Sequence, residues 1–223
     1  CAQVIVLSGD VPLIDADFVA ELAAAQAESG AAMVVATARL EDPTGYGRIV
    51  RSADGSVERV AETKVAGDAS EAELAIDEVN AGIYAFDREK LFSALSEVKA
   101  DNAQGEYYLP DVLPILKDRG EQVIAFELDS PELMLGVNDR ADLGEVQQLM
   151  NSRIINDHQL CGVTIVDPGS TWIDAAVTIE PDTVIEPATY LRGTTSIGPG
   201  ATIGPMTTIA HCEVEEGATI VHS

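Results

Sequence analysis

The chain has 223 residues, enough for one large domain or two small ones with a real core. Its 38 acidic and 13 basic side chains give a net charge of −25, and a surface this acidic repels nucleic acid and anionic membranes, so neither is expected as a partner. The three cysteines, Cys1, Cys161 and Cys212, lack metal-binding spacing. So sparse a set favours a reducing compartment, which predicts a cytoplasmic location.

The front part of the chain alternates short apolar runs with helical patterns. Strands are expected over residues 4–7, 33–37, 49–51, 57–60, 79–86 and 122–126. Helices are expected over 16–29, 88–97 and 110–118, and a longer one over about 139–159. Asp15 is expected to cap the first helix and Gly30 to end it, while Asp54-Gly55 indicates a hairpin. Strands that alternate with helices predict an α/β domain with a Rossmann-like, mostly parallel sheet.

Polar residues follow the first strand directly, as Ser8-Gly9-Asp10. Ligands of parallel sheets bind at the carboxyl ends of the strands. A carboxylate at that position is a natural Mg²⁺ ligand, because Mg²⁺ takes one or two hard protein oxygens with waters and substrate phosphates. The alternative is structural, with Asp10 capping the turn before Pro12. The fifth strand also carries a polar interruption, at residues 80–82.

The last third of the chain is a repeat of six residues. Aliphatic residues occupy every sixth position: Ile173, Ile179, Ile185, Leu191, Ile197, Ile203 and Ile209. Small residues precede the last six of them by two positions: Val177, Thr183, Thr189, Thr195, Ala201 and Thr207. A spacing of two places both side chains on one face of a short strand, and Pro or Gly follows at the corners. After Ile209 the spacing shortens by one, to Val214 and Ile220.

This pattern resembles the hexapeptide-repeat family, which implies a left-handed parallel β-helix built from three hexads per coil. The alternative, ordinary alternating strands of a sandwich, does not account for the regular period. The array stops at Ser223 without a capping element, and the first strand starts within the first few residues. We therefore expect the chain to be a piece of a longer protein, cut at both ends. The intact mass of the sample tests this expectation.

Five motifs together resemble one family. They are 8–13 (SGDVPL), 42–48 (DPTGYGR), 78–82 (EVNAG), 102–108 (NAQGEYY) and 136–140 (GVNDR), and they precede the hexads in that order. This arrangement is similar to the bifunctional bacterial GlmU family, which joins N-acetylglucosamine-1-phosphate uridylyltransferase to glucosamine-1-phosphate N-acetyltransferase. Trp172-Ile173-Asp174, where the hexads begin, is similar to actinobacterial members. The likeness covers essentially the whole chain.

The resemblance implies a site for the nucleotide sugar. Its residues are Ser8, Gly9, Asp10, Gly47, Glu62, Asn80 and Asn138. Asp10 and Asn138 match the two ligands of Mg²⁺. The backbone N–H of Gly47 is expected to meet the sugar, Glu62 to accept from its hydroxyls, and Asn80 to contact the sugar and its N-acetyl group. No residue of this chain is expected to act as a catalytic acid, base or nucleophile.

Structural alternatives stand beside three of these roles. Gly47 is also compatible with a simple turn, Glu62 with a solvated strand charge, and Asn138 with the cap of the helix that starts at 139. The joint occurrence of the motifs in family order favours the functional roles.

The implied reaction transfers UMP from UTP to N-acetylglucosamine-1-phosphate, and pyrophosphate leaves. Residues 1–140 would be the later part of the uridylyltransferase domain, 141–161 a linker helix, and 162–223 the start of the acetyltransferase β-helix. The resemblance also implies acetyl-CoA and glucosamine-1-phosphate as substrates of the second activity, a role in peptidoglycan precursor synthesis, and a homotrimer formed through the β-helix.

Two other functions remain open at this stage. One is a different hexose-1-phosphate nucleotidyltransferase with a β-helix tail, and the other is a non-catalytic scaffold of the same shape. The family's triphosphate-binding loop and its acetyl-CoA site have no counterpart in these residues. We therefore expect this piece alone to be inactive.

Overall fold

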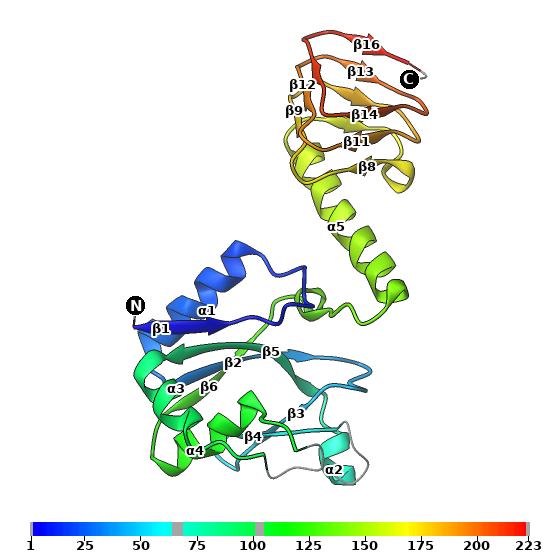
Figure 1. Ribbon diagram of the computed structural model, residues 1–223. Coiled ribbons are helices and arrows are strands. Elements are labelled where there is room, and N and C mark those ends of the chain that lie inside the picture. The colour runs from blue at the N-terminus through cyan, green and yellow to red at the C-terminus, as the bar shows by residue number, and fades with distance from the viewer. Residues whose placement is uncertain (1, 64–68, 101–104, 222–223) are drawn as a thin grey trace. The chain divides into compact units, whose positions relative to one another are not determined.

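The computed structural model describes residues 2–63, 69–100 and 105–221 (Figure 1). The chain divides into two compact units, residues 1–137 and 138–223. Asn102, Ala103 and Gln104 of the fourth motif lie outside the described residues. No helix in the described part of the chain is long and apolar enough to cross a membrane.

The front unit is built on one mixed sheet. Its strands are β1 (Gln3–Val6), β2 (Met33–Arg39), β3 (Arg48–Arg51), β4 (Val57–Ala61), β5 (Glu78–Asp87) and β6 (Val123–Glu127). The order is β4-β3-β5-β2-β6, and β1 pairs with β5 beside β3. Residues 49–51 and 57–60 form the expected hairpin, which extends to Arg48 and Ala61.

The α/β class is confirmed, but the expectation of a mostly parallel sheet is wrong. Among the described strands of this sheet, β2 and β6 form the one parallel pair. The reason is the position of β5. The helix after β1 returns the chain so that β1 and β2 run in the same direction, as a crossover should. However, β5 then inserts between them and runs antiparallel to β1, β2 and β3.

Helices cover both faces of the sheet. They are α1 (Ala16–Ser29), α2 (Glu71–Leu74), α3 (Arg88–Leu95) and α4 (Val112–Asp118), with 3-10 turns at Leu109–Asp111 and Pro131–Met134. Phe18 and Leu22 of α1 pack on one face, and residues of α3 and α4 pack on the other. Figure 1 shows the ribbons of these helices beside the sheet. The predicted ends of α1 are confirmed. The side chain of Asp15 accepts from the N–H of Phe18, and Gly30 ends the helix at φ +63°.

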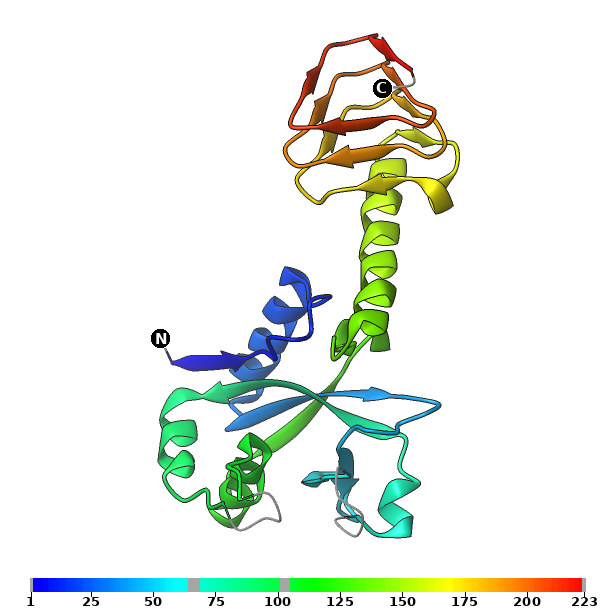
Figure 2. The same cartoon turned by 45° about the vertical axis from the view of Figure 1, so that its right-hand side comes forward.

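The back unit starts with α5 (Arg140–Leu160) and continues as a three-sided parallel β-helix (Figure 2). Its strands are β7 (Thr164–Ile165), β8 (Trp172–Ile173), β9 (Thr178–Ile179), β10 (Val184–Ile185), β11 (Tyr190–Arg192), β12 (Ser196–Ile197), β13 (Thr202–Ile203), β14 (Thr208–Ala210), β15 (Glu213–Val214) and β16 (Thr219–Ile220). Every third strand joins the same sheet, which is consistent with the left-handed β-helix expected from the hexads.

The register of the coils follows the predicted repeat. Ile185 pairs with Ile203, three hexads further on, and Leu191 pairs with Ile209. The shortened spacing after Ile209 is absorbed at a corner, because Val214 still pairs with Ile197. The small residues two positions before each aliphatic are buried as well, and buried threonine hydroxyls bond backbone carbonyls: Thr189 reaches Glu186 O at 2.7 Å. From β7 to β14 each strand therefore buries two side chains without leaving such hydroxyls unpaired.

Candidate active site

A bulge in β5 lies at the centre of the candidate site. Val35 of β2 pairs with Tyr84, and Thr37 pairs with Asn80, so β5 needs two more residues than β2 to cover the same step. Gly82 makes this possible with a φ of +73°, a conformation that other residues rarely adopt. Bulges of this kind bend a strand and re-aim its side chains. The interruption predicted at residues 80–82 is this bulge.

The bulge brings Ser8 and Asn80 to the same place. Ser8 Oγ donates to the carbonyl of Gly82 at 3.2 Å, and the N–H of Gly82 donates to Asn80 Oδ1 at 3.1 Å. A Cβ on Gly82 would lie 3.1 Å from Ser8 Oγ, closer than most side chains tolerate. The end of β1 and the middle of β5 therefore meet around a glycine that is needed for both space and backbone conformation.

Gly47 and Glu62 adjoin Asn80 from the other side. The N–H of Asn80 donates to the carbonyl of Gly47 at 2.8 Å. A Cβ on Gly47 would lie 2.8 Å from Val60 Cγ1 and 3.6 Å from Glu62 Oε1. The φ of Gly47 is not in the left-handed region, so glycine is required here for close approach and not for a turn. Four predicted residues, Ser8, Gly47, Glu62 and Asn80, thus come together within the front unit.

Arg48 holds the loop that presents Gly47. Its side chain is 3% exposed, and its Nη1 donates to the carbonyls of Pro43, at 2.6 Å, and of Tyr46. Thr63 Oγ1 donates to the same Tyr46 carbonyl at 2.9 Å. A guanidinium that bonds two carbonyls of one loop fixes its shape. The sequence gives no signal for this role of Arg48, because a polar loop does not reveal which of its side chains turns inward.

Tyr84 is a second residue that the sequence did not reveal. Asn80 Nδ2 donates to Tyr84 Oη at 2.7 Å, although the ring is only 4% exposed. Burial raises the pKa of Tyr84 to about 12; the negative charge of Glu62 acts in the same direction, and the hydrogen bond with Asn80 opposes it. The hydroxyl therefore stays protonated at neutral pH and lies within electrostatic range of the Glu62 carboxylate.

Asp10 follows β1 on the exposed surface of the front unit, like Gly9 before it. Its carbonyl accepts from the N–H of Val137 at 2.8 Å, and its Oδ2 would lie 3.7 Å from a Cβ on Gly136. The carboxylate makes no hydrogen bond or ion pair with any described residue. Backbone atoms close the turn before Pro12, where the N–H of Val11 approaches the carbonyl of Ser8 at 3.4 Å. The alternative in which the Asp10 side chain caps this turn is therefore wrong.

Asn138 begins the back unit, next in sequence to Val137. Its N–H and Nδ2 both donate to Asp142 Oδ2, at 2.9 and 3.3 Å. These bonds lower the pKa of Asp142. Asp139 caps α5 through bonds to the N–H groups of Ala141 and Asp142, so the alternative that gave this role to Asn138 is wrong by one residue. Asn138 Oδ1 makes no hydrogen bond within the described part of the chain.

Asp10 and Asn138, taken one at a time, each carry an oxygen of the kind that a hard divalent cation prefers. Asp10 offers an exposed carboxylate without a partner among the described residues, and Asn138 offers an amide oxygen. Mg²⁺ prefers such oxygens, and it usually takes few from the protein because waters and phosphates complete its shell. No group of three or more His, Cys, Asp or Glu residues gathers within the described ranges.

A hollow of about 410 Å³ opens beside Ser8. It is lined by Leu7, Ser8, Val11, Ile14, Asp15, Ala16 and Val19. Ser8 belongs both to this hollow and to the cluster around Gly82, so the surface beside the cluster is mainly apolar.

Sequence comparison identifies the class of protein that has this fold and this cluster. The model of the nucleotidyl transferase family matches residues 2–174, and the chain belongs to this family. The chain is 51% identical over 217 residues to the bifunctional protein GlmU of Brevibacillus brevis, covering 97% of this chain and 46% of that protein. It is 50% identical over 181 residues to the bifunctional protein GlmU of Mycolicibacterium vanbaalenii, covering 81% of this chain and 36% of that protein. The resemblance to GlmU is thus confirmed, and the chain spans less than half the length of these relatives.

Proposed function

We propose that the protein containing this chain transfers UMP from UTP to N-acetylglucosamine-1-phosphate, which yields UDP-N-acetylglucosamine and pyrophosphate. The convergence of Gly47, Glu62 and Asn80 around the β5 bulge carries the proposal. Backbone N–H, carboxylate and amide groups in such a cluster are suited to the hydroxyl and acetamido groups of a sugar. Membership of the nucleotidyl transferase family and the names of the relatives agree with it.

The reaction is an in-line displacement. An oxygen of the sugar phosphate forms a bond to the α-phosphorus of UTP, and the bond between that phosphorus and the bridging oxygen of pyrophosphate breaks. Gly47, Glu62 and Asn80 orient the sugar and so place its phosphate for attack. Asp10 and Asn138 would hold Mg²⁺, which when bound neutralises charge on the phosphate oxygens. The protein's own part is mostly positioning, because phosphoryl transfer needs little other covalent chemistry.

Replacing Asp10 with Asn in the full-length protein that contains this chain tests the metal and the reaction together. We expect Mg²⁺-dependent release of pyrophosphate from UTP and sugar phosphate to fall at least a hundredfold, because a neutral amide is a much weaker ligand than a carboxylate. Asp17→Asn is the matched control, since it makes the same chemical change at an exposed position in the first turn of α1. Undiminished turnover in Asp10→Asn would rule out this metal site.

The same assay distinguishes the two rival functions. Preference for ATP, GTP or TTP over UTP would favour a different hexose-1-phosphate nucleotidyltransferase. Absence of pyrophosphate release with any nucleotide would favour a scaffold. A scaffold has no reason to keep an exposed carboxylate and an amide oxygen available at Asp10 and Asn138, which argues against it.

For the back unit we propose a second activity, acetyl transfer from acetyl-CoA to glucosamine-1-phosphate. The domain assignment is then 1–140 for uridylyl transfer, 141–161 for the linker helix and 162–223 for the start of the acetyltransferase β-helix. The three-sided β-helix and the bifunctional relatives support this, and the relatives extend well beyond the matched residues. Release of the CoA thiol in the presence of glucosamine-1-phosphate is the test.

We also propose that the β-helix assembles as a homotrimer and that the protein acts in the cytoplasm, where UTP and acetyl-CoA are present. Flat faces of short parallel strands support the first point. The two described cysteines, Cys161 and Cys212, are free and exposed, which suits a reducing compartment. Light scattering that gives only the mass of a monomer would contradict the trimer.

A further inference from the structure

Asn80 and Tyr84 touch because of the bulge between them. In a regular strand, residues four positions apart lie about 13 Å from each other, too far for their side chains to bond. In β5, Asn80 Nδ2 and Tyr84 Oη are 2.7 Å apart, because the two additional residues of the bulge shorten the path. The bulge therefore creates a contact that neither residue would make in a regular sheet.

The contact fixes the orientation of the Asn80 amide. Its Oδ1 accepts from the N–H of Gly82 at 3.1 Å, and its Nδ2 donates to Tyr84. An amide has two acceptor sites and two donor hydrogens, so one of each remains for a ligand. Because both ends are tied, the free acceptor and the free donor point in fixed directions. A rotated amide would place its NH₂ group against the N–H of Gly82, which is unfavourable.

Tyr84 is suited to hold this amide and not to take part in proton transfer. Its hydroxyl is buried, and its pKa of about 12 keeps it neutral across the working range of an enzyme. The ring packs in the core beside Phe86, at a centroid distance of 5.8 Å, so the hydroxyl cannot move far. The Glu62 carboxylate acts electrostatically on the same hydroxyl. Tyr84 thus interacts both with the amide of Asn80 and with the carboxylate of Glu62.

We propose that Tyr84 is a positioning residue, which orients the Asn80 amide and thereby sets the preference for a sugar phosphate that carries an N-acetyl group. The inference rests on the proposed function, because it assigns Asn80 to the sugar. Tyr84 itself does not touch the substrate.

In the full-length protein that contains this chain, Tyr84→Phe removes the hydroxyl and keeps the ring. We expect the KM for N-acetylglucosamine-1-phosphate to rise about fivefold, the ratio that corresponds to one ordinary hydrogen bond, with kcat changed less than about twofold. The preference over glucose-1-phosphate, which lacks the acetamido group, should fall by the same factor. The pH profile of kcat should not change, since no proton transfer is lost. Tyr190→Phe, in the β-helix, is the matched control.

A double-mutant cycle with Asn80→Ala separates positioning from a general structural role. If Tyr84 acts through Asn80, Tyr84→Phe has no further effect on KM once Asn80 is alanine. An undiminished Tyr84→Phe penalty in that background would overturn the inference, as would an unchanged KM in Tyr84→Phe alone. If Asn80→Ala itself leaves KM and sugar preference unchanged, the proposed sugar site is wrong. Circular dichroism and melting temperature check that each variant is folded.

Discussion

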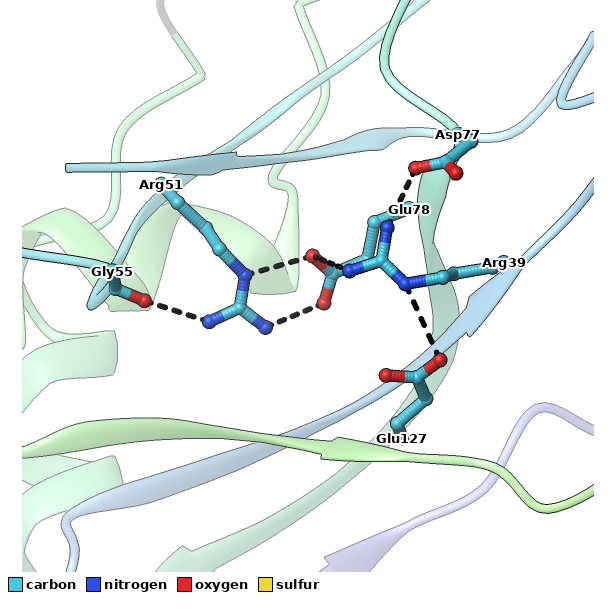
Figure 3. A network of polar contacts seen from close by, with 6 residues as sticks. All are labelled: Arg39, Arg51, Gly55, Asp77, Glu78 and Glu127. Atoms are coloured by element: carbon cyan, nitrogen blue, oxygen red, sulfur yellow. Dashed lines mark hydrogen bonds and ion pairs between the residues drawn. The ribbon is translucent and has the colours of Figure 1, made fainter. Parts of the chain in front are cut away.

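The ion-pair network at the start of β5 allows a quantitative prediction (Figure 3). Glu78 is only 3% exposed, and Arg51 binds it with two hydrogen bonds, of 2.7 and 2.6 Å. Arg39 approaches the same carboxylate at 3.7 Å and also pairs with Asp77 and Glu127. The network therefore connects β2, β3, β5 and β6. Its central carboxylate, Glu78, lies only two residues before Asn80 in the sequence.

Replacing Glu78 with Gln leaves the Arg51 guanidinium without its counter-charge and removes one of the three carboxylates near Arg39. Removal of one partner from a fully buried pair costs about 3–5 kcal/mol. Here the side chains of Arg51 and Arg39 are 37% and 51% exposed, so water replaces part of the lost interaction. Glutamine also still accepts one hydrogen bond. We therefore expect the free energy of unfolding of the front unit to fall by about 2 kcal/mol.

Glu127→Gln is the matched control, because it makes the same chemical change in the same network. Glu127 is 54% exposed and lies 3.4 Å from Arg39. An exposed pair of this kind contributes less than about 1 kcal/mol. The difference between the two variants isolates the effect of burial.

The assay must report on one unit, since a chain of two units need not unfold in one step. Amide hydrogen exchange in peptides from β5 and β2 gives the opening free energy of the front unit. Fluorescence of Trp172, the single tryptophan of the chain, follows the back unit. Equal effects of Glu78→Gln and Glu127→Gln, or a loss below about 0.5 kcal/mol in Glu78→Gln, would refute the reasoning.

The same network predicts a dependence on pH. Burial alone would raise the pKa of Glu78, but the hydrogen bonds and the charge of Arg51, together with the charge of Arg39, outweigh it and lower that pKa. A carboxylate with a lowered pKa in the folded state stabilises the fold above its unfolded pKa of about 4.3, and this contribution is lost as the pH falls through the folded value. The difference in the free energy of unfolding between wild type and Glu78→Gln should be constant around neutral pH and should become smaller in acid.

Four further substitutions test two glycines and the β-helix core. Gly82→Ala should raise the KM for the sugar phosphate and destabilise the front unit by at least about 1 kcal/mol, because φ is +73° and the new Cβ would lie 3.1 Å from a hydroxyl; steady-state kinetics and hydrogen exchange measure this. Leu191→Ala removes a fully buried side chain and should cost about 2–5 kcal/mol in urea unfolding followed by Trp172 fluorescence. Gly193→Ala should destabilise the same unit, because its Cβ would lie 2.2 Å from the His211 ring, and His211→Ala should restore part of the loss; no restoration would contradict the steric explanation.

Local sequence signals predicted the elements well. The caps of α1 and the hairpin at Asp54-Gly55 depend on neighbouring residues alone, and both appear as expected. The β-helix was predicted correctly from the hexads for a related reason, since each coil repeats the contacts of the coil before it. The prediction of strand direction in the front sheet was wrong, because direction depends on which strands pair over long distances in the sequence. No local pattern reveals that β5 inserts between β1 and β2.

In the candidate site too, the sequence did not reveal a contact that depends on how strands pair. Motif likeness identified Ser8, Gly47 and Asn80, and the structure brings them together. It gave no sign of Tyr84, because in a regular strand that side chain would be too far from Asn80 to matter. Only the excess of β5 residues over β2 around Gly82 reveals the contact. A glycine that distorts a strand therefore does two things here. Gly82 leaves space beside Ser8, and the bulge that it forms brings the buried Tyr84 into hydrogen-bond contact with the Asn80 amide.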